Sequence, residues 1–259
     1  MSEFWRHEVS EGVLTIWNCN AAQRNALTPE YYEGIRSGLV RAAGEKDLHA
    51  VVLAGEGGFF CSGGNLNALK ERRNLSVAER RGKVDELHGI IQAIRSCPKP
   101  VIAAVEGGAA GAGLSLAMAC DLIVAGESAK FTLAYVKAGL TPDGGASHAL
   151  MQAMPRATAA RMALLGTPLD ATRMYALGAV GDLVPDDEVL RRSQDLARQL
   201  GRGPEQAIAK IKQLLNAAET SDFETHLLAE RDAVCDALGG DEAAEGMRAF
   251  LEKRKPVFR

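Results

Sequence analysis

Short apolar runs and longer amphipathic stretches alternate along the first two hundred residues of the chain. The short runs are rich in Val, Ile and Ala, which is typical of buried strands, whereas apolar residues spaced three and four apart predict helices that face a core. Pro98 and Pro100 end the longest of these helices, because proline disfavours helical geometry in the residue before it. The predicted strands cover residues 12–17, 50–54, 101–105 and 121–125, and the predicted helices cover residues 29–42, 79–95 and 114–119.

The chain after residue 203 has a different pattern. Leucine and other large apolar residues recur there at helical spacing, without strand-like runs between them. We therefore expect an α/β fold for residues 1–200 and a helical region for residues 201–259. The stretch at residues 72–83 is polar and basic, and we expect it to form a mobile, solvated rim.

Composition narrows the classes of function. The chain has 259 residues, 47% of them hydrophobic, and a net charge of −3. This length suits one large domain with a sizeable core, and the charge offers no attraction for nucleic acid or an anionic membrane. The apolar runs are too short and too interrupted by glycine to span a bilayer. The amino-terminal residues lack the apolar core of a signal peptide, so we expect a cytoplasmic protein.

Cysteine and histidine give no sign of a disulfide framework or a metal centre. The five cysteines contain no C-x-x-C pair and are expected to be reduced. The five histidines have no metal-ligand spacing, so we expect no bound metal. His148 follows shortly after Asp143 and could face a pocket, but we interpret it as a structural histidine.

A glycine-rich loop follows the predicted strand at residues 101–105 and precedes an apolar helix. Backbone N–H groups at the start of a helix have no internal partner and carry the positive end of its dipole. Such a loop can hold a bound phosphate or an oxyanion that forms during a reaction. The spacing does not fit a dinucleotide fingerprint, a Walker loop or a hydrolase elbow. The alternative is a tight turn that serves packing, and the glycines in question are Gly107, Gly108, Gly111 and Gly113.

A second glycine-rich loop, at residues 55–66, also runs from a buried strand towards a helix. Two loops of this kind could each direct one backbone N–H to the same oxygen. The second loop therefore favours an oxyanion site over a packing turn.

The two loops, at this separation, resemble the oxyanion-hole segments of the crotonase family, the enoyl-CoA hydratases and isomerases. The resemblance is carried by FFCSGGNL at residues 59–66 and by residues 101–121, and it extends to Arg24-Asn25-Ala26-Leu27, FTLAYVKAGLTPDGGAS and AFLEKRKPVF. It covers nearly the whole chain. It implies a crotonase-like spiral of ββα units, with residues 201–259 as a separate helical cap that packs across subunits of a homotrimer or homohexamer.

The resemblance also implies an acyl-CoA thioester substrate, with no cofactor other than the coenzyme A of that substrate. The backbone N–H groups of Gly64 and Ala112 would form the oxyanion hole. Residues that match coenzyme A-binding or loop positions of the family are Arg24, Ala26, Ser62, Gly63, Asn65, Leu66, Asn67, Phe250 and Lys253. For Arg24 and Lys253, ordinary surface charge is the alternative.

The acid–base residues of the hydratases are replaced in this chain. Where hydratases carry two glutamates, it has Ser115 and Tyr135, and neither is a ready base near neutral pH. We expect both to line an acyl pocket with Leu140. Asp143 is the remaining carboxylate, and it has two interpretations. Its position before a predicted helix suits an N-cap, and it also matches the acidic residue that carries the proton in isomerases of the family.

The sequence therefore favours an acyl-CoA isomerase that uses an oxyanion hole and one aspartate. In its motifs it is closest to the branch that isomerises 1,2-epoxyphenylacetyl-CoA, or to the isomerases that shift an enoyl-CoA double bond. The alternatives are a member of the family with weak or no hydratase activity and a non-catalytic protein that binds CoA esters. Tyr135 argues against a dehalogenase, because dehalogenases of the family have a tryptophan near this position.

Overall fold

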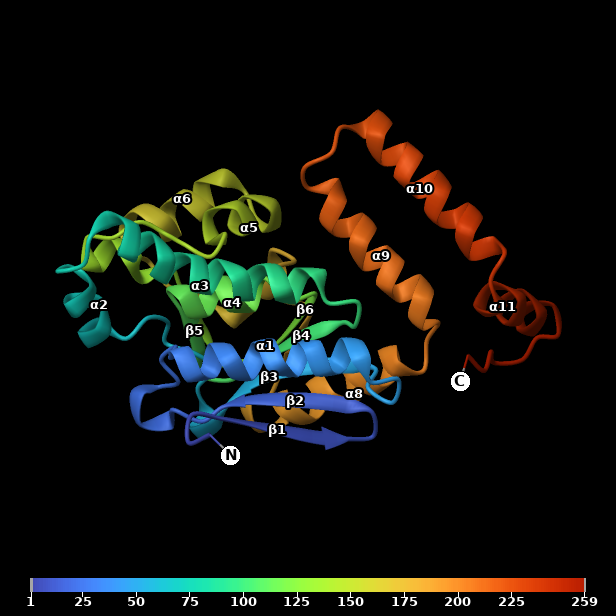
Figure 1. The fold of residues 1–259 in the computed structure, drawn as a ribbon, viewed down its shortest axis with the longest axis horizontal. Coiled ribbons are helices and arrows are strands. Elements are labelled where there is room, and N and C mark those ends of the chain that lie inside the picture. The colour runs from blue at the N-terminus through green and yellow to red at the C-terminus, as the bar shows by residue number, and fades with distance from the viewer. Residues whose placement is uncertain (1, 259) are drawn as a thin grey trace.

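A six-stranded, mostly parallel sheet forms the centre of the protein. The computed structural model describes residues 2–258 (Figure 1). Neighbouring strands of this sheet are parallel except for its first two, which form an antiparallel hairpin. The strands follow the order β1 (Trp5–Ser10), β2 (Val13–Asn18), β3 (Ala50–Gly55), β4 (Val101–Val105), β6 (Leu122–Gly126) and β9 (Asp182–Val184).

Helices cover both faces of this sheet, which is why its inner strands read as continuous apolar runs. Successive residues of β3 point to opposite faces. Val51 and Leu53 belong to the larger core, beneath α1 (Pro29–Gly44) and α3 (Val77–Ser96). Val52 faces the other way and packs in a smaller core beneath α8 (Val189–Gly201).

A second, three-stranded sheet begins where the chain leaves β4. Its strands follow the order β5 (Gly108–Ala110), β7 (Lys130–Thr132) and β8 (Leu169–Asp170). The chain passes from β4 of the first sheet directly to β5 of the second, and β5 is part of the glycine-rich loop that follows β4. Shorter helices surround this region: α2 (Leu66–Arg72), α4 (Ala112–Met118), α5 (Ala146–Ala153), α6 (Arg156–Leu165) and α7 (Ala171–Ala176).

The basic stretch at residues 72–83 is exposed for most of its length, as expected, and its second part belongs to α3. The Ser76 hydroxyl accepts a hydrogen bond from the Glu79 N–H, and the Glu79 carboxylate accepts one from the Ser76 N–H. This reciprocal cap fixes the start of a helix. The predicted start of α3 at Glu79 is therefore corrected to Val77.

Three helices complete the chain and extend away from the sheets: α9 (Glu205–Ala218), α10 (Phe223–Leu238) and α11 (Asp241–Leu251) (Figure 1). The helical character of this region is as predicted. Lys212 joins α9 to the body of the protein. Its buried ammonium group donates to Ile94 O (2.9 Å), Lys99 O (3.3 Å) and Asp121 Oδ2 (2.7 Å).

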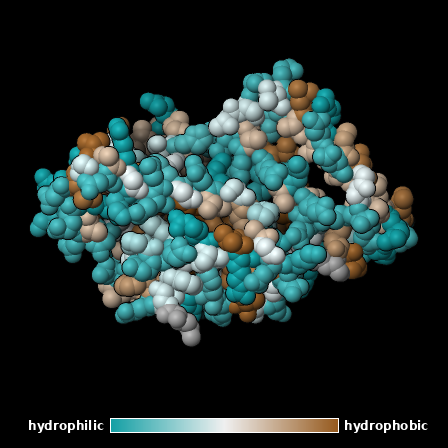
Figure 2. Space-filling model, viewed as in Figure 1, coloured by the Kyte–Doolittle hydropathy of each residue, from teal (hydrophilic) through white to brown (hydrophobic). Residues whose placement is uncertain are grey.

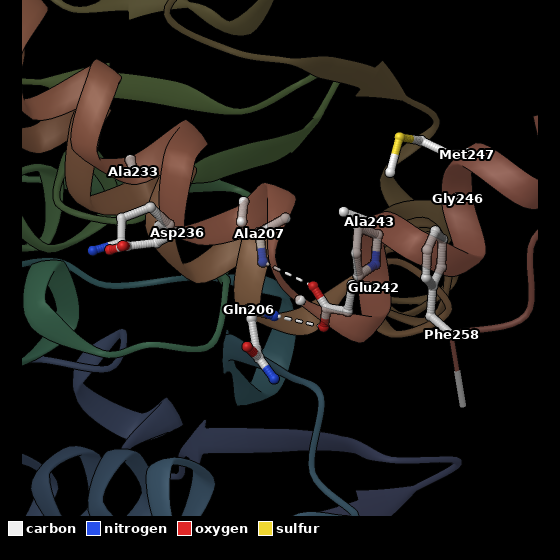
Figure 3. Close-up of a pocket in the computed structure, with 13 residues that line it drawn as sticks. Gln206, Ala207, Ala233, Asp236, Glu242, Ala243, Gly246, Met247 and Phe258 are labelled. Carbon is white, nitrogen blue, oxygen red and sulfur yellow. Dashed lines mark hydrogen bonds between the residues drawn. The ribbon is translucent and has the colours of Figure 1, made fainter.

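Large apolar side chains remain exposed on these last helices, and Figure 2 shows hydrophobic residues among the hydrophilic ones over them. A cavity of about 430 Å³ lies between the three helices (Figure 3). At its edge, the Glu242 carboxylate accepts from the N–H groups of Gln206 and Ala207 at the start of α9. The most exposed apolar residues of these three helices are Leu215, Phe223, Leu238, Phe250 and Leu251.

Within residues 2–258, the structure has no helix both long and apolar enough to cross a membrane.

Candidate active site

The two glycine-rich loops are joined by a short parallel bridge. Cys61 of the first loop pairs with Ala109 of β5. The Ala110 N–H donates to Cys61 O at 2.9 Å, and the Cys61 N–H donates to Gly108 O at 3.3 Å. A Cβ on Gly113 would lie 2.4 Å from Cys61 O, so only glycine fits there. The contact that the sequence predicted between the two loops is therefore present and close-packed.

Gly63 brings the first loop against the start of α4. It has a φ of +90°, which favours glycine. A Cβ at this residue would lie 2.5 Å from Ala110 O and 3.0 Å from the amide nitrogen of Ala112. Gly64, the next residue, therefore lies beside the first turn of α4.

The N–H groups of Gly64 and Ala112 are both free of intramolecular partners. Ala112 is the first residue of α4, where helix geometry provides no acceptor and the dipole is positive. Among residues 2–258, neither amide donates a hydrogen bond. Free backbone donors beside a helix N-terminus can stabilise a negative oxygen. Both amides are therefore available for the predicted oxyanion hole.

The segment that contains Arg24 holds the first loop in place through hydrogen bonds. Arg24 O accepts from the Ser62 N–H (3.0 Å), and the Leu27 N–H donates to Gly63 O (2.8 Å). Asn25, fully buried, has a φ of +56° and donates from its side chain to the carbonyl oxygens of Glu56 and Phe59. The sequence places Asn25 in a segment that resembles the family, but only the structure shows that its side chain holds this loop.

Several predicted coenzyme A-binding residues gather around this loop. The exposed Arg24 guanidinium lies 5.8 Å from the centre of the Phe59 ring. Ala26 is buried beside it. The Ser62 hydroxyl donates to Gln23 O at 3.1 Å. These contacts leave the Arg24 charge at the surface, where it can meet an anionic group.

The same group continues into α2. The Asn65 side chain caps this helix, accepting from the N–H groups of Asn67 (2.9 Å) and Ala68 (3.2 Å). Asn65 also donates to the Gln23 side chain at 2.6 Å. Leu66 is 70% exposed. The half-buried Asn65 and the exposed Leu66 and Asn67 therefore form one rim next to Gly64.

Phe250 and Lys253 do not join this group within one chain. Phe250 lies on α11 and is 83% exposed. Lys253 follows the end of that helix and is exposed. Figure 1 shows α11 and α2 at opposite ends of the molecule. A shared site with Arg24 would therefore need the α11 of another copy.

Ser115, Tyr135 and Asp143 meet at one point beside α4. The Tyr135 hydroxyl donates to Asp143 Oδ1 at 2.5 Å, and the Ser115 hydroxyl donates to the backbone O of Asp143 at 2.9 Å. Ser115 Oγ and the Tyr135 hydroxyl are 3.3 Å apart. Ser115 lies three residues after Ala112, a rise of about 4.5 Å along the helix. The predicted pocket residues and the predicted proton carrier are thus neighbours, close to the oxyanion amides.

Asp143 is not a helix cap, which corrects one of its two interpretations. The residue at the N-cap of α5 is Gly145, and no side chain caps this helix. Gly144 and Gly145 have φ values of +60° and +76°, and they delay the start of the helix to Ala146. A Cβ on Gly144 would lie 2.8 Å from Ser115 Cβ. The glycine pair therefore lets this loop lie against α4, with the Asp143 carboxylate bonded to Tyr135.

The environment of Tyr135 keeps it protonated. Burial, followed by the nearby Asp143 carboxylate, raises the pKa of Tyr135 well above its usual value of 10. The hydroxyl therefore acts as a hydrogen-bond donor at neutral pH. It cannot itself be the base that removes a substrate proton.

Leu140 belongs to the turn that joins Tyr135 to Asp143, and His148 lies further along the chain, in α5. Leu140 is 46% exposed, and its N–H donates to Tyr135 O at 3.0 Å, which closes the turn between Tyr135 and Asp143. His148 lies on the surface of α5, with Nε2 3.3 Å from a carboxylate oxygen of Glu219. The structural interpretation of His148 agrees with this surface contact.

Sequence and structure comparisons agree on one family. A profile described as enoyl-CoA hydratase/isomerase matches residues 8–259. A 1,2-epoxyphenylacetyl-CoA isomerase from Escherichia coli (strain K12) is 34% identical over 259 residues, covering 100% of this chain and 99% of the relative. A probable enoyl-CoA hydratase from Rhodobacter capsulatus is 36% identical over 254 residues, covering 98% and 96% of the two chains.

The structural comparison gives the same result. The crystal structure of an enoyl-CoA hydratase from Polaromonas sp. JS666 has a TM-score of 0.96 and 38% sequence identity to this protein, and the match covers 98% of this chain and 99% of that chain. The crotonase-like fold expected from the sequence is therefore confirmed. The chain belongs to the enoyl-CoA hydratase/isomerase family, the crotonases.

Proposed function

We propose that the protein is an acyl-CoA isomerase that moves a proton with one carboxylate beside an oxyanion hole. The observation that carries this proposal is the placement of Asp143. Its Oδ1 accepts a hydrogen bond from a protonated tyrosine. Its backbone O accepts one from Ser115, which lies about one helical turn after the free Ala112 amide. A base and an oxyanion site so close together suit chemistry at the carbon next to a thioester carbonyl.

The oxyanion hole would act on the thioester oxygen. When the proton leaves the α-carbon, the electron pair of the C–H bond moves towards the carbonyl and forms an enolate. The N–H groups of Gly64 and Ala112 would donate to this oxygen as its charge grows. Each such donor is worth about 3–4 kcal/mol in the transition state.

Asp143 would accept this proton and return it at a different carbon. A single carboxylate suits such a 1,3-shift, because the base that removes the proton becomes the acid that returns it. The relative named 1,2-epoxyphenylacetyl-CoA isomerase supports an isomerase reading. A double-bond shift in an enoyl-CoA ester and the isomerisation of a ring epoxide are the two substrate classes that we propose.

Hydration is the second candidate, because another relative of similar identity is named a probable enoyl-CoA hydratase. Against it stand Ser115 and Tyr135, which occupy the positions where, by family resemblance, hydratases carry glutamates. Their hydroxyls are engaged with each other and with Asp143. We therefore propose that hydratase activity is weak.

Coenzyme A would bind along the rim that runs from Arg24 to Asn67. The exposed guanidinium of Arg24 suits a phosphate group. Because Phe250 and Lys253 are remote from Arg24 in one chain, we propose that they contribute from a second copy in a trimer or hexamer. The exposed apolar residues of α10 and α11 support such an assembly.

A substrate panel tests the proposed function. The wild-type protein is incubated with 3-enoyl-CoA, 2-enoyl-CoA and aryl-epoxide CoA esters, and products are identified by mass and absorbance. We expect an isomer of the 3-enoyl or the epoxide ester, and little 3-hydroxyacyl-CoA. Binding of the esters without turnover of any of them would instead support a non-catalytic CoA-ester-binding protein.

A further inference from the structure

The hydrogen bond between Tyr135 and Asp143 leaves the two carboxylate oxygens of Asp143 in different situations. Oδ1 accepts from the Tyr135 hydroxyl at 2.5 Å. The backbone of Asp143 is held separately, because its O accepts from the Ser115 hydroxyl at 2.9 Å. The residue is thus fixed both through its side chain and through its main chain, and Oδ2 has no hydrogen-bond partner among residues 2–258.

We propose that Tyr135 is a positioning residue, which holds Asp143 Oδ1 so that Oδ2 alone exchanges the proton with the substrate. This inference rests on the proposed isomerase function and adds a role for a residue that the sequence placed only in the acyl pocket. Tyr135 acts through Asp143 and does not itself exchange the substrate proton.

The local backbone is built to bring these two residues together. Tyr135 lies in a short 3-10 helix, Ala134–Ala138, which ends at Gly139 with a φ of +66°. The Leu140 N–H bonds back to Tyr135 O, so the chain reverses and Asp143 returns to the tyrosine ring. On the far side, the glycine at 144 permits contact with α4. No regular helix or strand separates the tyrosine from the aspartate.

The charge state of Tyr135 suits this role. Its pKa is raised by burial and by the Asp143 carboxylate, so the phenol remains protonated and donates a hydrogen bond at neutral pH. Other charged groups are nearby: burial mainly raises the pKa of Tyr32 of α1, Arg72 of α2 lowers it, and Asp143 and Glu86 of α3 raise it further. These groups are unchanged in a Tyr135 variant.

Tyr135→Phe removes only the donor. The Asp143 carboxylate then loses its fixed orientation, and a displacement of about 1 Å costs roughly 100-fold in rate. We expect kcat to fall by about 10-fold or more, with KM changed less than about twofold.

The experiment compares four proteins on the isomerised substrate: wild type, Tyr135→Phe, Asp143→Asn and the double variant. Tyr175→Phe, the same change at a half-exposed residue of α7, is the matched control. If Tyr135 acts through Asp143, the tyrosine change has little further effect once the carboxylate is gone. The inference would be overturned if the rate losses of the two single variants multiply in the double variant, or if Tyr135→Phe keeps a kcat within twofold of wild type.

A failure of the proposed function gives a different result from a failure of the positioning role alone. If wild type does not isomerise any ester of the panel, the function is wrong and the role of Tyr135 in it falls as well. If wild type isomerises and Tyr135→Phe is kinetically silent, only the positioning role is wrong.

Discussion

The candidate site has two halves that are built in different ways. The oxyanion half consists of backbone: two loops bridged through Cys61 and Ala109 present the N–H groups of Gly64 and Ala112. The proton-transfer half consists of side chains, with Tyr135 bonded to Asp143. A backbone donor is insensitive to most substitutions but vulnerable to any change that moves or deletes the N–H. The proton-transfer half has the opposite sensitivity, because its chemistry depends on the side chain of Asp143.

Asp143→Asn should have the largest effect. Asparagine retains an oxygen that can accept from Tyr135, so the loop should keep its conformation, but the group that takes the proton is lost. Loss of a general base costs about 100- to 10,000-fold in rate, and binding of CoA esters should be retained. Asp222→Asn, the same change at the N-cap of α10, is the control and should be silent because Asn caps as well as Asp. Full activity in a folded Asp143→Asn protein would remove Asp143 from the mechanism.

Ala112→Pro should have the second largest effect, because it deletes one N–H donor of the oxyanion half. Proline is tolerated at the first position of a helix, where its missing N–H has no partner in any case. The protein should therefore fold, as circular dichroism would verify, yet lose about 100- to 1000-fold in kcat. Ala112→Gly keeps the N–H and is the control, with a loss of a few-fold at most. Equal rates for the two variants would mean that this amide does not stabilise the transition state.

Gly63→Ala tests whether the activity of the oxyanion half depends on the close packing of its two loops. The new Cβ would meet Ala110 O at 2.5 Å, and the φ of +90° disfavours alanine. The loop must shift, which should reduce kcat by about 10- to 100-fold, since displacements of about 1 Å are costly. Thermal unfolding would measure the accompanying loss of stability, about 1–3 kcal/mol. Unchanged activity would show that the placement of Gly64 tolerates movement.

Ser115→Ala should have the smallest effect of these variants. It removes the hydrogen bond to Asp143 O, but the Tyr135 bond to the carboxylate remains. A single neutral hydrogen bond contributes about 1 kcal/mol, so kcat should fall by roughly fivefold. A loss as large as that of Asp143→Asn would indicate that Ser115 contacts the substrate directly.

Much of the fold could be predicted because the buried strands are continuous apolar runs. The strand at Val101–Val105 begins and ends where its sequence indicates, and both glycine loops follow strands as expected. The strand β1 was missed because its sequence, WRHEVS, is mostly polar and lies at the edge of the sheet. Strands as short as β5 and β8 carry too few residues for a period to appear.

In the candidate site, too, one part could be predicted from the sequence and another could not. The backbone donors could be located from glycine spacing and family resemblance. The contact between Tyr135 and Asp143 could not, because it depends on the left-handed turn at Gly139 and on the glycine pair after Asp143. Without those backbone angles, an aspartate after proline is typical of a helix N-cap. The same angles move the start of α5 to Ala146 and leave the carboxylate with Tyr135.

Isotope labelling tests the central claim, proton transfer by one carboxylate without added water, most directly. The wild-type protein is incubated with a 3-enoyl-CoA ester in water enriched in oxygen-18, and the products are resolved by mass. We expect the conjugated 2-enoyl isomer, without oxygen-18, as the main product. Formation of 3-hydroxyacyl-CoA that carries oxygen-18, at a rate comparable to isomerisation, would contradict this claim.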